Sequence, residues 1–124
     1  MDTKLDSLSP EFKPKAIELL ARLTEANIPV KIINTLRTDE EQAANLARGA
    51  SWVKRSKHQD GNAIDICPYL VYRIDGEDKL EWDSKYPIWQ KVGVIGESLG
   101  LVWGGRWTQV DSGHFELSIK TEDV

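Results

Sequence analysis

The feature that most restricts the fold of this chain is a pair of matched histidine segments that lie far apart in the sequence. The first is SKHQDGNAID (56–65), and the second is DSGHFE (111–116). His58 and His114 are the only histidines among 124 residues, and each has a carboxylate and a glycine nearby. Two imidazoles and one aspartate satisfy a catalytic zinc ion, which leaves its fourth position to water. One site built from both segments requires a fold that brings them together.

Local patterns favour a metal site made only of histidine and carboxylate. Cys67 is the only cysteine, so no disulfide can form within the chain and no C-x-x-C pair can bind zinc. We expect Cys67 to be a small buried residue without chemistry. Gly61 permits a tight turn after His58, and strand alternation then puts Asp65 on the face opposite Ile64. The competing interpretation of each histidine alone is a satisfied core or surface residue.

Composition excludes several classes of protein. Sixteen basic and twenty acidic residues give a formal net charge of -4, without a block of like charge, which argues against a general nucleic-acid binder. Hydrophobic residues make up 40% of the chain, but no segment approaches the roughly 18 apolar residues that a membrane span requires. The first residues, MDTKLDSLSPEFK, lack the layout of a secretory signal. We expect a chain that is made in the cytoplasm and stays there unless it is released.

The sequence predicts an α+β fold in a single domain over residues 1–124, with an antiparallel sheet covered on one face by helices and the metal site on the open face. Hydrophobic spacing of three and four predicts helices, and β-branched or alternating runs predict strands. The predicted helices cover residues 10–26, 38–49 and 86–100, and the predicted strands cover 28–36, 62–67 and 114–119.

Turn and capping residues set the expected boundaries. Ser9 is a candidate N-cap for the first helix, with Pro10 in its first position. Thr38 and Glu41 have the spacing of a capping box, which places Arg37 at a strand-to-helix junction. Pro68 is expected to stop its strand. Residues 50–60 are expected to be irregular, and residues 69–84 contain an Asp-Gly pair typical of a hairpin or flap.

The two histidine segments resemble a known family. SKHQDGNAID matches the S-x-H-x-x-G-x-A-x-D motif of the zinc peptidases grouped with lysostaphin, the D-alanyl-D-alanine peptidases and sonic hedgehog. DSGHFE resembles the second motif of that group, acid-x-x-His. Within it, the chain most resembles the short L-alanyl-D-glutamate endopeptidases of phage endolysins, which share WGG followed by W, here residues 103–107. The resemblance extends from about residue 37 to residue 117.

The resemblance implies roles for individual residues. It makes His58, Asp65 and His114 the zinc ligands, and it makes Asp111 the general base. The alternative for Asp111 is a turn aspartate that caps its own backbone. Arg37 matches the arginine that polarises the scissile carbonyl and stabilises the oxyanion. Arg37 could instead form a surface ion pair with one of the acidic residues 39 and 40.

Three further residues are candidates for contact with substrate, and two of them, Gln42 and Ser56, match positions that relatives use for it. Gln42 resembles a polar groove residue, Ser56 opens the first motif, and Trp103 is expected to form a wall of the groove together with Trp107. The competing interpretation is solvation for Gln42 and Ser56, and core packing for at least one of the two tryptophans.

The resemblance implies a zinc-dependent peptidoglycan hydrolase that cuts the bond between L-alanine and D-glutamate in the stem peptide. A D-alanyl-D-alanine carboxypeptidase or dipeptidase is the alternative enzyme. Two possibilities without catalysis also remain, a zinc domain used for binding and a structural fold that holds no metal. We expect a monomer whose partner is the stem peptide, with no nucleic-acid or membrane partner. Action on the wall would follow cell lysis or release through a holin-type pore.

Overall fold

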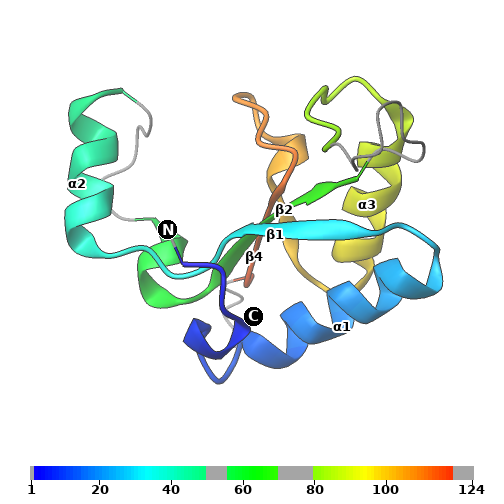
Figure 1. Cartoon of the computed structure of the whole chain (residues 1–124), viewed down its shortest axis with the longest axis horizontal. Coiled ribbons are helices and arrows are strands. Elements are labelled where there is room, and N and C mark those ends of the chain that lie inside the picture. Colours follow the sequence, from blue (N-terminus) through cyan, green and yellow to red (C-terminus); the bar gives the residue numbers. More distant parts are fainter. Residues whose placement is uncertain (1, 50–55, 70–79, 119–124) are drawn as a thin grey trace, which may run out of the picture.

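A four-stranded antiparallel sheet forms the centre of the computed structural model, which describes residues 2–49, 56–69 and 80–118 (Figure 1). The strand order is β1-β2-β4-β3, so the last two strands of the sequence pair beside the first two. The strands are β1 (Val30–Asn34), β2 (Ala63–Pro68), β3 (Val102–Trp103) and β4 (His114–Glu116). The predicted α+β class with an antiparallel sheet is confirmed.

Two of the three α-helices pack together against one face of this sheet. The α-helices are α1 (Lys13–Glu25), α2 (Asp39–Ala47) and α3 (Pro87–Ser98), and the 3-10 turns are η1 (Leu5–Ser7), η2 (Lys57–Asp60) and η3 (Gly104–Arg106). Helices α1 and α3 contact each other, whereas α2 stands apart beyond the other end of β1 (Figure 1). None of the helices in the described ranges is long and apolar enough to cross a membrane.

Strand alternation divides the sheet into an apolar face and a polar face, as predicted for β2. Ile64 and Ile66 on β2 and Phe115 on β4 are fully buried beneath the helices. The register pairs Ile64 with Phe115 and Asp65 with His114, so Asp65 and His114 share the opposite face. Core residues from α1, the turn before it and α3 complete the apolar side: Phe12, Ala16, Leu19, Leu23 and Val92.

Two glycines let α3 lie close to the sheet. A side chain at Gly93 would overlap the indole of Trp103, and one at Gly96 would overlap the ring of Phe115. The two glycines lie three residues apart and therefore share one face of the helix. The absence of side chains at these positions creates the space that the two aromatic rings fill.

The first helix begins later than predicted. Residues 10–12 form a turn, and α1 begins at Lys13 with Pro14 in its first turn. The Ser9 hydroxyl accepts from the backbone N–H of Phe12 at 3.1 Å and donates to Asn62 Oδ1 at 2.5 Å. Ser9 therefore caps the turn of residues 10–12, which precedes α1, and links this turn to the segment before β2.

Other observed boundaries differ from the predicted ones by a few residues or agree with them. The capping box of Thr38 and Glu41 is confirmed. Strand β1 is shorter than predicted at both ends, and its register shifts between Ile32 and Asn34. Pro68 is the last residue of β2, where it pairs with Val30. Its carbonyl accepts a hydrogen bond from the backbone N–H of Glu81 at 2.8 Å.

The expectation for residues 50–60 is corrected in part, because 57–60 form the regular turn η2, while 50–55 lie outside the described residues. Tyr69 and Leu80 form an isolated antiparallel bridge. The rest of the predicted hairpin or flap, residues 70–79, also lies outside the described residues.

Candidate metal centre

Three side chains from three elements converge on the polar face of the sheet. His58 comes from η2, Asp65 from β2 and His114 from β4. Gly61 ends η2 in the left-handed conformation (φ 73°), which turns the chain back so that His58 faces Asp65. One potential ligand atom from each of the three residues lies within 4.8 Å of the other two. The structure therefore brings together the three residues that the family resemblance implies as ligands.

The ring of His58 is oriented by the protein backbone. Its Nδ1 lies 2.7 Å from the carbonyl oxygen of Thr35. A carbonyl only accepts, so Nδ1 carries the hydrogen and Nε2 of the neutral ring has a free lone pair. Nε2 lies 3.1 Å from Asp65 Oδ2, is buried and makes no hydrogen bond with any described residue. A buried nitrogen that has a free lone pair and lies beside a carboxylate is suited to bind a metal ion.

Ser56 supports His58 from the start of the same turn. Its side chain accepts a hydrogen bond from the backbone N–H of His58 at 3.1 Å and forms a capping box with Gln59. The structure gives Ser56 a capping role and leaves its predicted contact with substrate as a prediction.

The ring of His114 is oriented by a side chain that the family motifs did not single out. Glu116 Oε1 lies 2.8 Å from His114 Nε2, and Asp65 Oδ1 lies 3.1 Å from His114 Nδ1. The carboxylate of Glu116 accepts from Nε2, which leaves Nδ1 as the nitrogen available to a metal ion. The signal in the sequence was the spacing of two along a strand, which puts residues 114 and 116 on one face.

The charges at this site depend strongly on one another. Burial disfavours the charged form of Asp65, but the hydrogen bond from His114 and the close contact with His58 outweigh burial and hold the pKa of this carboxyl well below its usual range. Burial likewise opposes protonation of His114, but the carboxylates of Asp65 and Glu116 raise its pKa to about 9. Without a metal ion, His114 is therefore a cation at neutral pH, and metal binding must displace its proton.

Asp111 lies beside this group, in the turn before β4. Its Oδ2 is 4.0 Å from His114 Nδ1, and its side chain is 51% exposed. Partial burial and the nearby charge of Asp65 raise its pKa above the ordinary value. Within the described part of the chain, its carboxylate makes no hydrogen bond to the backbone of residues 112 and 113, so it does not cap its own turn.

A glycine turn fixes the position of Asp111. The backbone N–H of Asp111 donates to the carbonyl of Gly104 at 2.9 Å, and a side chain at Gly104 would collide with the carbonyl of Asp111. The backbone N–H of His114 donates in turn to the Asp111 carbonyl at 3.1 Å. The WGG segment therefore determines where the carboxylate of Asp111 lies relative to His114.

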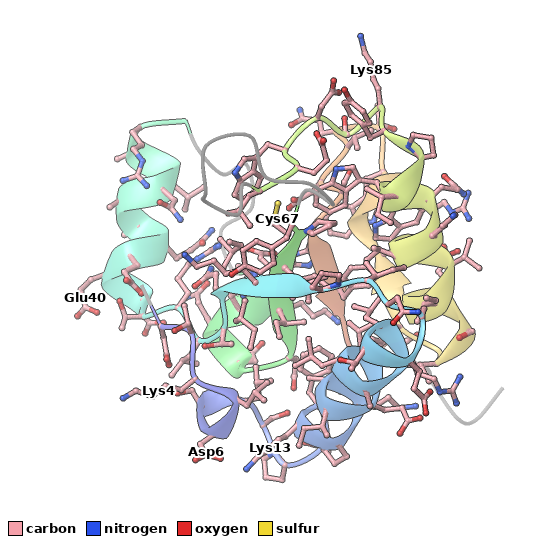
Figure 2. All side chains as sticks on the ribbon, turned by 45° about the vertical axis from the view of Figure 1, so that its right-hand side comes forward. Lys4, Asp6, Lys13, Glu40, Cys67 and Lys85 are labelled. Atoms are coloured by element: carbon pink, nitrogen blue, oxygen red, sulfur yellow. The ribbon has the colours of Figure 1, made fainter. Side chains whose placement is uncertain are left out.

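Arg37 reaches the site from the junction between β1 and α2, as predicted. Its backbone N–H donates to the carbonyl of His58 at 3.0 Å, and its Nη1 donates to Gln42 Oε1 at 2.7 Å. Gln42 is almost fully buried, so it holds the guanidinium in place and is not part of a groove surface. Glu40 points outward from α2, away from the site (Figure 2). The positive charge of Arg37 acts on Asp111 and favours its ionised form.

The two tryptophans of the WGG segment have different environments. Trp103 is 4% exposed, stacks on Phe115 with 6.5 Å between ring centres, and donates from Nε1 to Ser112 O at 2.8 Å. The structure thus places Trp103 in the core instead of a groove wall. Trp107 is the tryptophan beside the site, since its ring centre lies 5.0 Å from that of His114.

Cys67 shares the polar face with Asp65 but is fully buried. Burial and the nearby charge of Glu81 raise the pKa of its thiol to about 11. Figure 2 shows its sulfur at the end of β2 farther from α1. The prediction that Cys67 is a buried residue is confirmed, and a thiol with this pKa is not reactive at neutral pH.

Comparisons with known proteins agree with this arrangement. A peptidase M15 family model, described as D-alanyl-D-alanine carboxypeptidase, matches residues 49–117. The L-alanyl-D-glutamate peptidase of Escherichia phage T5 is 32% identical over 118 residues, which cover 90% of this chain and 83% of that protein. The chain belongs to the M15 peptidase family. The matched residues of this peptidase include His58, Asp65, Asp111 and His114.

Two further proteins are similar to this M15 peptidase. The L-alanyl-D-glutamate peptidase of Listeria phage A118 is 34% identical over 118 residues, or 94% of this chain. The chain spans only 40% of the length of that relative. The crystal structure of the Serratia marcescens L-Ala D-Glu endopeptidase ChiX superposes with a TM-score of 0.70 at 25% identity, covering 92% of this chain and 83% of that one. The family is that of a metal-dependent peptidase, and the three residues on the polar face can hold the metal.

Proposed function

We propose that this M15 peptidase is a zinc-dependent peptidoglycan hydrolase that cuts the L-alanyl-D-glutamate bond of the stem peptide. The observation that carries the proposal is that both phage relatives, which align over nine tenths of the chain, are L-alanyl-D-glutamate peptidases. The solved structure with this fold is also an L-Ala D-Glu endopeptidase. The residues in the site supply the parts that hydrolysis of an amide needs.

Zinc is the metal that the donor set favours. Two imidazole nitrogens and one carboxylate oxygen form the three-ligand set of catalytic zinc, and the second nitrogen of each ring is held by an oxygen acceptor. When bound, the zinc ion would supply a Lewis acid for the scissile carbonyl and lower the pKa of a water molecule. His58, Asp65 and His114 are the proposed ligands.

Asp111 and Arg37 have the proposed catalytic roles. Asp111 accepts the proton of the attacking water and then gives it to the leaving amine, so no covalent intermediate with the enzyme is required. Its raised pKa brings it closer to the range of an effective proton carrier. Arg37 carries a fixed charge held by Gln42 and stabilises the negative charge that develops on the carbonyl oxygen.

The proposal includes the setting in which the peptidase acts. Residues 1–124 form a single peptidase domain, monomeric and without a nucleic-acid or membrane partner. Access to the wall follows cell lysis or passage through a holin-type pore. Light scattering of the purified protein tests the monomer, and a cell lacking any pore or lysis function tests the route, since intact export from such a cell contradicts it.

Mass spectrometry of purified peptidoglycan fragments tests the activity. The zinc-loaded protein should leave L-alanine on muramic acid and release a peptide that starts with D-glutamate. His114→Ala and Asp111→Ala, incubated beside it, should give neither product. A matched control is Arg22→Gln on α1, whose partner Glu18 is exposed, and this variant should cut as the parent does.

Two different results would change the proposal. Loss of terminal D-alanine would establish instead the carboxypeptidase activity for which the family model is named. No product from protein with stoichiometric zinc would favour a zinc-containing binding domain. Protein purified without added metal that contains no zinc, and gains none on exposure to it, would contradict the metal site itself.

A further inference from the structure

A hollow lies between the end of β1 and one face of α2, next to the metal centre. Its volume is about 290 Å³, and it is lined by Asn34, Arg37, Glu41, Ala44, Asn45 and Arg48. Three of these residues belong to α2 and Arg48 is its C-cap, and the spacing of three and four puts all four on the same face of the helix. This face contains a single apolar side chain, that of Ala44, and none of the four belongs to the hydrophobic core of the described residues. The face of α2 that looks toward the sheet is therefore a polar surface.

The hollow has the charge of an anion site. Arg37 and Arg48 contribute two guanidinium groups, and Asn34 and Asn45 contribute two carboxamides. The single acid, Glu41, accepts a hydrogen bond from the backbone N–H of Thr38 at 2.8 Å in the capping box. Two fixed positive charges and one negative charge leave the lining with a net charge of about +1, and guanidinium and amide N–H groups are the donors that a carboxylate accepts.

The second arginine is available for a ligand. Arg48 is exposed at the end of α2, and its Nη2 donates to Asn45 Oδ1 at 2.5 Å. Among the residues that the structure describes, its guanidinium meets no carboxylate. The contact with a neutral carboxamide keeps the side chain over the hollow without neutralising it, so its remaining N–H groups can donate to an anion.

Two backbone connections tie the hollow to residues of the metal centre. The backbone N–H of Arg37 donates to the carbonyl of His58, and Asn34 pairs in register with Asp65 across the sheet. The register shift between Ile32 and Asn34 moves Asn34 to the polar face, where it is almost fully buried. Two residues that line the hollow, Asn34 and Arg37, thus contact the backbones of two proposed metal ligands, and Arg48 lies at the far end of α2.

The proposed substrate contains an anion near the scissile bond. A D-glutamyl residue acylated by L-alanine has two carboxyl groups, and a continuing peptide uses at most one of them. At least one carboxylate therefore remains free within one residue of the amide that is cut. We propose that the hollow between β1 and α2 is a carboxylate-binding subsite, in which Arg48, with Arg37, binds the free carboxylate of the D-glutamyl residue. This inference rests on the proposed function, and it assigns to Arg48 a part in substrate choice.

The test compares two synthetic peptides of the sequence acetyl-L-alanyl-D-glutamyl-L-lysine. They differ only in the free carboxyl group of D-glutamate, which is a carboxylate in one and a primary carboxamide in the other. The zinc-loaded peptidase should cut the acid with a kcat/KM about tenfold higher, because a hydrogen bond between two charged groups is lost in the amide. In Arg48→Gln the ratio of the two values should fall toward one, and in Arg48→Glu the preference should reverse. Arg22→Gln is the matched control and should keep the ratio of the parent.

A binding measurement separates this inference from the proposed function. Calorimetry on zinc-loaded Asp111→Ala gives the dissociation constants of both peptides without turnover, and the acid should bind about tenfold more tightly unless Arg48 is also replaced. Equal kcat/KM and equal affinity for the two peptides would overturn the subsite while leaving the cleavage established. An acid preference that survives in Arg48→Gln would overturn it as well. Binding with this preference but without cleavage by the parent would contradict the proposed activity and leave the subsite standing.

Discussion

His58 and His114 present opposite ring nitrogens to the same carboxylate. Nε2 of His58 lies 3.1 Å from Asp65 Oδ2, and Nδ1 of His114 lies 3.1 Å from Asp65 Oδ1. The remaining nitrogens have different acceptors, the neutral carbonyl of Thr35 for His58 and the carboxylate of Glu116 for His114. The orientation of the second ring therefore depends on a side chain that can be replaced, while that of the first depends on the backbone.

Replacing Glu116 should weaken zinc binding. In Glu116→Ala the Nε2 hydrogen of His114 loses its acceptor, so the ring is free to turn Nδ1 away from Asp65, and we expect a loss in affinity of about 10- to 100-fold. Glu116→Gln keeps an oxygen acceptor and should retain most of the affinity. Competition with a chromophoric chelator measures both constants. Equal zinc affinity in the parent and in Glu116→Ala would show that this carboxylate does not position the ring.

Stability of the metal-free protein should fall as the pH rises from about 6.5 to about 9. The pKa of His114 is raised to about 9, above the value of about 6.5 for an unfolded chain. The stabilising charge is fully present below pH 6.5 and is lost as the proton leaves the folded state, a change of roughly 3 kcal/mol. Urea unfolding at several pH values, with a chelator present, measures it. His114→Ala should lack this dependence; a parent curve that stays flat over the same range would contradict the assignment.

The affinity for zinc should rise over the same pH range in which the metal-free protein loses stability. Binding requires an unprotonated His114, so the apparent affinity should rise with pH until the proton no longer competes, near pH 9. Zinc titrations between pH 6 and 9, in a buffer that does not bind metal, measure this directly. An affinity that does not change over this range would mean that the metal ion does not displace the proton of His114.

Replacing Asp111 should separate catalysis from metal binding. Asp111→Asn removes the proton acceptor but keeps the size of the side chain, and we expect kcat to fall by about 10²- to 10⁴-fold. Zinc content, measured by atomic absorption, should stay at one ion per chain, whereas His114→Ala should lose both zinc and activity. Loss of zinc from Asp111→Asn would make this residue part of the metal ligand set.

Gly96→Ala should destabilise the fold, although alanine normally favours a helix. The new methyl group would overlap the ring of Phe115, which pairs with the strand residue next to Asp65, and overpacking of this kind costs about 1–3 kcal/mol. Val94→Ala, on the exposed side of the same helix, is the control and should change stability little. Thermal unfolding compares them. A melting temperature of Gly96→Ala at or above that of the parent would show that α3 can move away from the sheet.

Local sequence patterns predicted the parts of this structure that local forces determine. The capping box of Thr38 and Glu41 and the alternation of Ile64 and Asp65 depend on neighbours in the chain, and both agree with the structure. The resemblance identified three candidate ligands, which the fold brings within 4.8 Å of one another. Their roles stay predictions until metal binding is measured.

Contacts between distant segments could not be predicted from single residues. Trp103 was expected to form a groove wall, but its ring fills the space that Gly93 leaves open in α3. Gln42 was expected on a polar surface and is instead buried against Arg37. The acceptor for His58 is a backbone carbonyl, a group that every residue has, so nothing in the side chain of Thr35 could indicate it.

The separate position of α2 has a consequence for how related enzymes can diverge. This helix contributes no residue to the core cluster of the described chain, and Gln42 is its only buried side chain. Mutations on its remaining surface can therefore accumulate with little effect on folding, while they alter the charges offered to a substrate. An enzyme built in this way can adapt to a wall of different chemistry by changing one helix and keeping the metal-binding sheet intact.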